Sequence, residues 1–101
     1  MKRPAATYQF TVPRTKVAPR FEAEMCRVFG GFTANDAEGV WRNEYGAVER
    51  ERVRVYQVTT DKGRHLQVAV ARFLHALGER FYYFGKVGAH VVRPTIGRNG
   101  R

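Results

Sequence analysis

The stretch from residue 49 to residue 60 (ERERVRVYQVTT) constrains the fold of this chain more than any other. It is rich in β-branched and aromatic residues and contains neither Gly nor Pro, which predicts one long strand. Side chains alternate between the two faces of a strand. The even-numbered face then carries Arg50, Arg52, Arg54 and Tyr56. We expect helices to bury Val53 and Val55 on the other face, so the arginine row must face water, an anion or a partner chain.

Hydrophobic periodicity and turn residues divide the rest of the chain into alternating strands and helices. We expect a strand at 7–12, a helix from Pro19 to the Gly30-Gly31 pair, and a strand at 32–42 broken near Asn35 and Gly39 by a bulge or irregular loop. A turn at 43–46 then leads into the 49–60 strand. A second amphipathic helix follows over 66–77, with Asp61 as its cap, and one or two short strands lie between 81 and 92.

The order strand, helix, strand, strand, helix, strand predicts an α+β fold. We expect a two-layer ferredoxin-like sandwich (βαββαβ), in which an antiparallel sheet carries two helices on one face. The first and third strands are central in that topology, which suits the unbroken 53–58 segment. Residues 7–93 form the single domain, between a flexible N-terminus (1–6) and a flexible basic tail (94–101).

The net charge of +9 is concentrated at the two ends of the chain. Residues 1–20 carry +5 and residues 93–101 carry +3, whereas the body from 21 to 92 carries only +1. Basic ends favour polyanions electrostatically without specifying one, and they also keep a protein soluble. Cys26 is the only cysteine, and no apolar run is long enough to cross a membrane. A cytoplasmic protein without membrane contact is therefore expected.

The arginine row is the sharpest candidate binding site. Guanidinium groups suit bidentate contact with phosphate or carboxylate, and Tyr56 on the same face offers a stacking surface. The alternative is that acids on neighbouring strands, a partner subunit or water neutralise the row. Around the hairpin, Trp41, Arg42 and Tyr45 could add stacking and charge, and Lys86 could add another positive charge. A lone Trp is, however, usually a core residue or an interface anchor.

Other chemistry finds little support in the sequence. Gly30-Gly31 follows a helix and lacks the Lys-Ser/Thr ending of a P-loop, so a helix C-cap explains it better. His65, His75 and His90 are not in a metal-ligand spacing, and Cys26 lies beside the apolar stripe of the first helix, where a thiol acts as a small apolar group. We expect no metal, no cofactor and no enzymatic activity.

Several short motifs occur along the chain: FGGFT at 29–33, G-x-W at 39–41, Gly46 followed by Glu51, and Val55-Tyr56. In these motifs the chain resembles a group of small phage and mobile-element proteins of about a hundred residues. Members of the group tend to have a Gln-Gly pair after the second helix, where this chain reads Tyr83-Phe84-Gly85-Lys86. The resemblance implies a phage-type accessory protein, and such proteins often counter host defences by binding something.

Three partners remain open at this point. The first hypothesis is a non-enzymatic protein that sequesters a phosphorylated small ligand, such as a nucleotide immune signal, at a homo-oligomer interface. The second is sequence-tolerant nucleic-acid binding through the basic ends and the open sheet face. The third is inhibition of a host defence complex by direct protein binding. Composition does not separate them.

Overall fold

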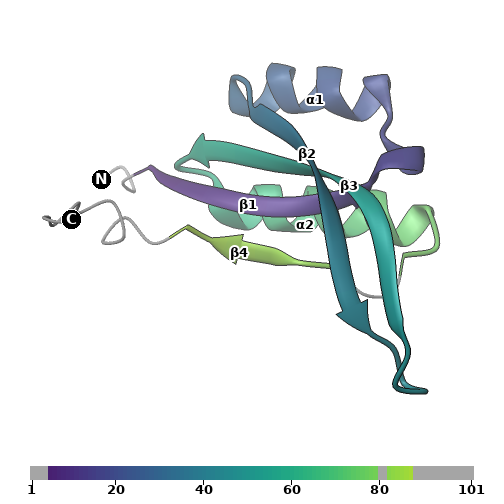
Figure 1. Cartoon of the computed structure of the whole chain (residues 1–101). Coiled ribbons are helices and arrows are strands. Elements are labelled where there is room, and N and C mark those ends of the chain that lie inside the picture. The colour runs from purple at the N-terminus through teal and green to yellow at the C-terminus, as the bar shows by residue number, and fades with distance from the viewer. Residues whose placement is uncertain (1–4, 80–81, 88–101) are drawn as a thin grey trace, which may run out of the picture.

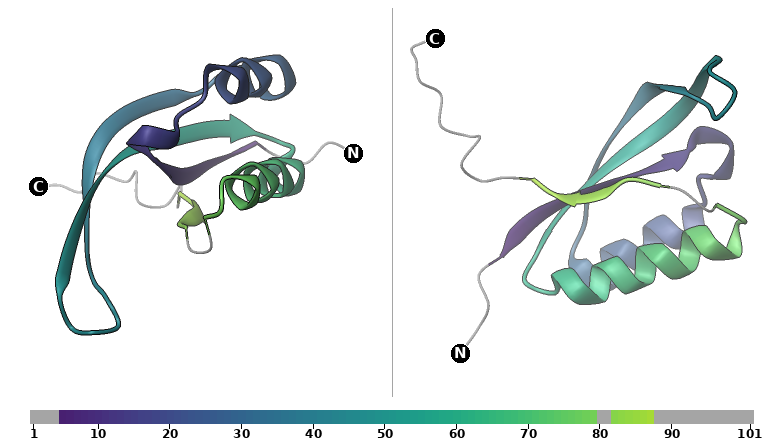
Figure 2. Two further views of the ribbon diagram at one scale, coloured as in Figure 1. Left: turned by 90° about the vertical axis from the view of Figure 1, so that its right-hand side faces the viewer. Right: turned by 90° about the horizontal axis from the view of Figure 1, so that it is seen from below.

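The fold is a four-stranded antiparallel sheet with two helices packed on one face, as seen in a computed structural model that describes residues 5–79 and 82–87 (Figures 1 and 2). The elements in chain order are β1 (Ala6–Pro13), a 3-10 turn (Arg14–Lys16), α1 (Pro19–Phe29), β2 (Thr33–Arg42), β3 (Val48–Thr60), α2 (Gly63–Ala76) and β4 (Phe84–Lys86). The sheet order is β2-β3-β1-β4. The α+β class and the two-layer arrangement are therefore confirmed.

The helices cover the even-numbered face of β3, which is the face opposite to the one predicted. Tyr56 and Val58 are fully buried, whereas Val53 and Val55 lie on the open face and keep part of their surface exposed. The register between β1 and β3 explains why this face is buried. Phe10 of β1 lies opposite Tyr56, and the two rings stack with centroids 5.2 Å apart. The combined apolar surface of these residues far exceeds that of two valines, so burying it is more favourable.

The hydrophobic core joins both helices to the two central strands. Its fully or almost fully buried members are Phe10, Val12, Met25, Tyr56, Val58, Leu66, Val70 and Leu74. Helix α1 ends at Gly30, whose φ of 90° and N–H bond to the Cys26 carbonyl (3.0 Å) confirm the C-cap. Cys26 itself is exposed, so the expectation that it acts as a small apolar group beside the buried stripe was wrong. No helix in the described residues is long and apolar enough to span a membrane.

Helix α2 begins at Gly63 and buries Leu66, Val70 and Leu74 against the sheet. The predicted Asp61 cap is wrong, because no side chain caps this helix and the Lys62 N–H donates to Thr60 Oγ1 (3.0 Å) instead. At the other end, Gly78 adopts a φ of 83°, and the Glu79 N–H reaches the Leu74 carbonyl at 3.0 Å. This pattern closes the helix and turns the chain toward β4.

The β2–β3 hairpin projects beyond the helices and the other two strands as a free arm (residues 37–52; Figures 1 and 2). β2 pairs with β3 in one unbroken register from Thr33 to Arg42, so the predicted break or bulge was wrong. The turn forms as expected around Gly46, whose φ is 85°. Asn43 Oδ1 accepts hydrogen bonds from the backbone N–H groups of Tyr45 (2.9 Å) and Ala47 (3.0 Å), which fixes the loop.

The two chain ends fall largely outside the described residues. Ala6 already pairs with Thr60, so the first strand starts one residue before the predicted domain boundary. Within residues 82–87, the described part of the predicted 81–92 stretch, the last strand covers Phe84–Lys86. Residues 1–4, residues 88–92 and the predicted basic tail at 94–101 lie outside the described part of the chain.

The packing of Tyr8 over the start of α2 predicts a strong penalty at Gly63. A Cβ atom there would lie 2.1 Å from Tyr8 Oη and 2.4 Å from its Cζ. Gly63→Ala should lower the free energy of unfolding by about 1–3 kcal/mol, measured by urea denaturation, despite the better helix propensity of Ala. The combination with Tyr8→Leu should recover part of this loss. Arg64→Ala, at the exposed next position of α2, serves as the control and should change little.

Candidate functional site

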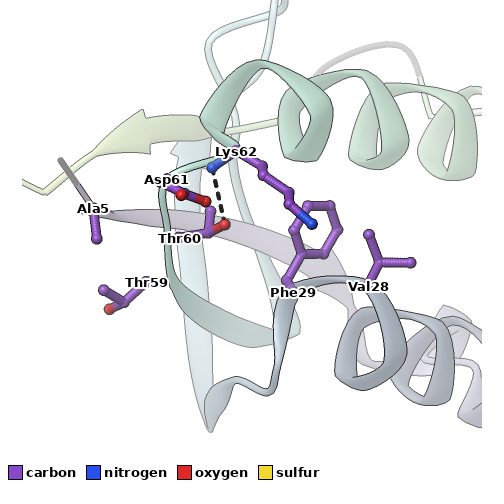
Figure 3. Close-up of a pocket in the computed structure, with 7 residues that line it drawn as sticks. All are labelled: Ala5, Val28, Phe29, Thr59, Thr60, Asp61 and Lys62. Atoms are coloured by element: carbon purple, nitrogen blue, oxygen red, sulfur yellow. Dashed lines mark hydrogen bonds between the residues drawn. The ribbon is translucent and has the colours of Figure 1, made fainter. Parts of the chain in front are cut away.

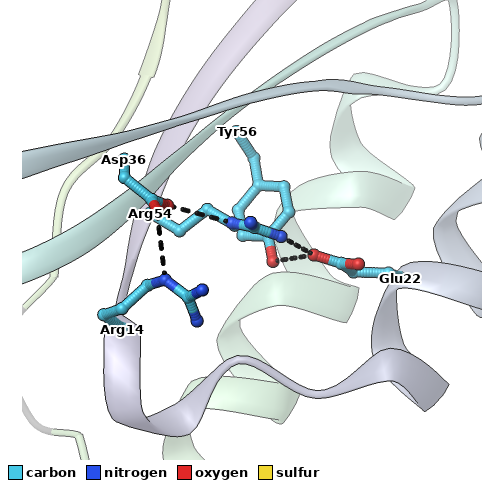
Figure 4. Close-up of polar contacts among 5 residues, drawn as sticks. All are labelled: Arg14, Glu22, Asp36, Arg54 and Tyr56. Atoms are coloured by element: carbon cyan, nitrogen blue, oxygen red, sulfur yellow. Dashed lines mark hydrogen bonds and ion pairs between the residues drawn. The ribbon is translucent and has the colours of Figure 1, made fainter.

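Arg54 sits between two carboxylates where the core ends and the arm begins (Figure 4). Its Nη1 donates to Glu22 Oε2 of α1 at 2.8 Å, and its Nε donates to Asp36 Oδ1 of β2 at 3.3 Å. Asp36 Oδ2 also accepts from Arg14 Nε at 3.2 Å, and the Tyr56 hydroxyl donates to Glu22 Oε2 at 2.5 Å. One chain of polar contacts therefore connects the turn after β1 with α1, β2 and β3.

These contacts set the protonation of the network. The hydrogen bond from Tyr56, assisted by Arg54, holds the pKa of Glu22 below its usual value, although partial burial opposes this shift. The hydrogen bond from Arg54 is the main reason that the pKa of Asp36 is also lowered. Burial, followed by the hydrogen bond to Glu22, raises the pKa of Tyr56. The network is thus charged on Arg54, Glu22 and Asp36 and neutral on Tyr56 at physiological pH.

The rest of the predicted arginine row is partly neutralised by the protein itself. Arg50 Nη1 contacts Glu38 Oε1 across the arm at 3.1 Å, and both side chains are well exposed. Arg52 lies directly opposite Glu38 and forms no ion pair within the described residues. Tyr56 is fully buried and stacked on Phe10, so no ligand can stack on it. The row is therefore not a set of three free guanidinium groups.

The remaining predicted site residues do not converge. The Arg42 Nη1 donates to the Gly46 carbonyl at 2.9 Å and supports the turn, while Tyr45 stands 86% exposed at the tip. Trp41 points to the open face, opposite Glu49, and so lies on the other side of the sheet from the arginines. Lys86 belongs to β4, which β1 and β3 separate from β2. The structure therefore brings Arg54 and Tyr56 together and leaves the others dispersed.

A groove of about 810 Å³ lies between the open face of the arm and the segment that joins α2 to β4. It is lined by three aromatic and two acidic side chains, together with Thr11, Val53 and two glycines; the five are Trp41, Tyr82, Tyr83, Glu51 and Glu79. Trp41, Tyr82 and Tyr83 are 40–50% exposed, so each leaves a large apolar surface open to solvent. Of these residues only Trp41 was among the predicted site residues. The consecutive tyrosines were a detectable signal, but the sequence does not show that they lie beside the arm.

Two smaller hollows lie at the opposite end of the sheet, and they share Phe29 and Thr59. One, of about 410 Å³, is lined by Ala5, Val28, Phe29, Thr59, Thr60, Asp61 and Lys62 (Figure 3). The other, of about 370 Å³, is formed around Gly30-Gly31 and Gln57. Lys62 is the one basic residue among their described lining residues, so neither resembles an anion site. Among the residues that the structure describes, no group of His, Cys, Asp or Glu could hold a metal ion.

Comparison with known proteins adds no relative, since the sequence matches no protein-family model and no curated protein. The function must therefore follow from the chemistry of the surfaces. Of these, the groove at the base of the arm is the largest and the most aromatic of the hollows described above.

The Arg54 network predicts that the protein loses stability in acid. Glu22 and Asp36 have lowered pKa values in the folded state, so the unfolded chain binds protons first as the pH falls. The contribution of these two carboxylates to the free energy of unfolding is complete above their pKa values in the unfolded chain. It disappears as the pH drops through their pKa values in the folded protein. The urea midpoint should therefore fall markedly between pH 7 and pH 3. Glu22→Gln should show a smaller fall, whereas Glu44→Gln at the tip of the arm should behave like the wild type.

Proposed function

We propose that this chain is a non-enzymatic binding protein that recognises a segment of another protein in the groove beside the arm. The observation that carries this proposal is the gathering of exposed aromatic side chains around one acidic groove. In keeping with the phage-type resemblance, we propose that the partner belongs to a host defence complex. The element order and the sheet order β2-β3-β1-β4 also support assignment to the ferredoxin-like type of sandwich.

Exposed apolar groups on the arm support a protein partner. Among the described residues, four of the seven large exposed hydrophobic side chains belong to the arm: Val40, Trp41, Tyr45 and Val48. The core does not use them, since its members come from β1, α1, α2 and the second half of β3. Trp41 faces the groove, whereas Val40 and Val48 lie on the opposite face of the arm. Exposed Trp and Tyr side chains are typical of protein interfaces.

The charge around the groove argues against phosphate and in favour of a basic segment. Glu51 and Glu79 line it, and no basic residue is among its described lining residues. Lys16 Nζ contacts Glu79 Oε2 at 2.6 Å, whereas Glu51 forms no ion pair with a described residue. The arm as a whole carries four acidic and three basic residues, so it does not attract a polyanion. A Lys or Arg side chain would find both an aromatic surface and a carboxylate here.

The ligand-capture hypothesis loses its main support in this geometry. It required the arginine row to be free for an anion, but Arg54 is held by Glu22 and Asp36, and Arg50 contacts Glu38. The nucleic-acid alternative depended on basic ends that lie mostly outside the described residues and on an open sheet face that is acidic at the groove. The fluorescence experiment described next distinguishes both alternatives from peptide binding.

The single tryptophan makes occupancy of the groove directly measurable. Short peptides that pair Lys or Arg with an apolar residue should shift the fluorescence of Trp41, whereas acidic peptides should not. Glu51→Gln should weaken this binding about two- to fivefold, the range for one exposed ion pair. Tyr82→Ala should weaken it by about tenfold because an aromatic wall is lost.

Glu44→Gln removes the same charge at the tip of the arm and should leave peptide binding unchanged. A shift of Trp41 fluorescence by a cyclic dinucleotide or by single-stranded DNA, combined with no response to basic peptides, would contradict the proposal. If Arg52→Ala abolished that response, anion capture by the arginine row would be the better explanation.

A further inference from the structure

The outer edge of β2 has no pairing strand within the described part of the chain. β2 has β3 as its one described neighbour and runs for ten residues without a proline, a lysine or a bulge. Eight of its ten residues are exposed, and the other two are Ala34 and Gly39. Natural edge strands of this length are usually interrupted or covered, because they offer unpaired hydrogen-bonding groups to another chain.

The hydrogen-bonding pattern shows which residues of β2 point outward. The Asn43 N–H donates to the Ala47 carbonyl at 2.8 Å, one position beyond the last pair, Arg42 with Val48. Hydrogen-bonded and non-hydrogen-bonded pairs alternate in an antiparallel ladder. Odd-numbered residues of β2 therefore direct their backbone groups at β3, whereas Glu38, Val40 and the other even-numbered residues direct theirs away from the sheet.

We propose that β2 pairs antiparallel with β2 of a second copy, with Val40 facing Val40 across a two-fold axis. This register places Glu38 opposite Arg42 twice, once on each side of the axis. It also places Trp41 opposite Gly39 twice, at non-hydrogen-bonded pairs where side chains come closest. A Cβ atom at Gly39 would lie 3.7 Å from Cζ3 of Trp41 in the same chain, so the two indoles of the dimer would lie close together on the open face beside the axis.

Charges disfavour three other registers that keep each face of β2 on the same side of the joined sheet, namely those centred on residues 37, 38 and 39. Centring the pair on Glu38 would set two glutamates against each other, and centring it on Ala37 would set Asp36 against Glu38. Like charges directly opposite are destabilising. Centring it on Gly39 would require Asp36 to pair with Arg42, although Arg14 and Arg54 already hold Asp36. Glu38, by contrast, has only an exposed contact with Arg50.

This pairing would extend the groove across two chains. Trp41 and Gly39 lie on the open face beside Glu51 and Val53. Trp41 of each copy would stand opposite Gly39 of the other, so the two grooves would meet at the junction. The inference rests on the edge and the charges of β2 and does not depend on what the groove binds.

Reversing the charges at residues 38 and 42 tests the proposed pairing of Glu38 with Arg42 directly. Sedimentation equilibrium should show that the wild type is a dimer, and Glu38→Arg or Arg42→Glu alone should raise its dissociation constant by about tenfold or more, because two attractive pairs become repulsive. An equimolar mixture of the two variants should form heterodimers, since each 38–42 contact then joins opposite charges. Native mass spectrometry distinguishes these heterodimers by mass, and circular dichroism confirms that each variant is folded.

A second variant keeps the test independent of charge. Val40→Lys should dissociate the dimer, whereas Val68→Lys, at a comparably exposed valine on α2, should leave it intact. A wild type that is monomeric, or a dimer unaffected by Val40→Lys, would overturn the proposal. A dimer that Arg42→Glu weakens but Glu38→Arg does not would overturn the register.

Discussion

The contact of Arg54 with Glu22 and Asp36 is the interaction on which the arrangement of this molecule depends. β3 changes character at that point: Tyr56 and Val58 beyond it are buried, and residues 49–52 before it are exposed. The charged guanidinium group of Arg54 is tolerated at the edge of the core because two carboxylates pair with it and offset its partial loss of hydration. The same contacts attach α1 to the sheet and fix the place from which the arm projects.

Arg54 is the most buried of the arginines that the structure describes, and its contacts with Glu22 and Asp36 leave it unavailable to a ligand. The proposed binding site therefore lies on the other face of the sheet. The open face carries Trp41 and Glu51 on the arm and Val53 at its base, and the segment after α2 adds two tyrosines. None of these side chains is required by the core. A rigid sheet that presents aromatic groups on a projecting hairpin is suited to recognising another protein surface. The same hairpin exposes the edge through which two copies can join.

Local sequence signals predicted most of the secondary structure. Pro19 and Gly30 marked the ends of α1, Gly46 marked the turn, and alternation marked β1 and β3. Alternation sorts side chains into two faces, but it does not say which face turns inward. That depends on neighbouring strands, here on Phe10 and Val12 beside Tyr56 and Val58. Asn35, Asp36 and Gly39 suggested a break in β2 because they are poor strand residues, yet pairing along β3 overrides that tendency. The groove could not be predicted from the sequence, because it is formed by segments that lie far apart along the chain.

A double-mutant cycle between Arg54 and Glu22 tests this central claim most directly. Urea unfolding at pH 7 would be measured for Arg54→Met, Glu22→Gln and the double variant. If Arg54 is an internal anchor, the double variant should be destabilised clearly less than the sum of the two single variants, because either change alone breaks the same contact. Strictly additive losses, together with an unchanged position of α1 signals in NMR spectra of Arg54→Met, would contradict it.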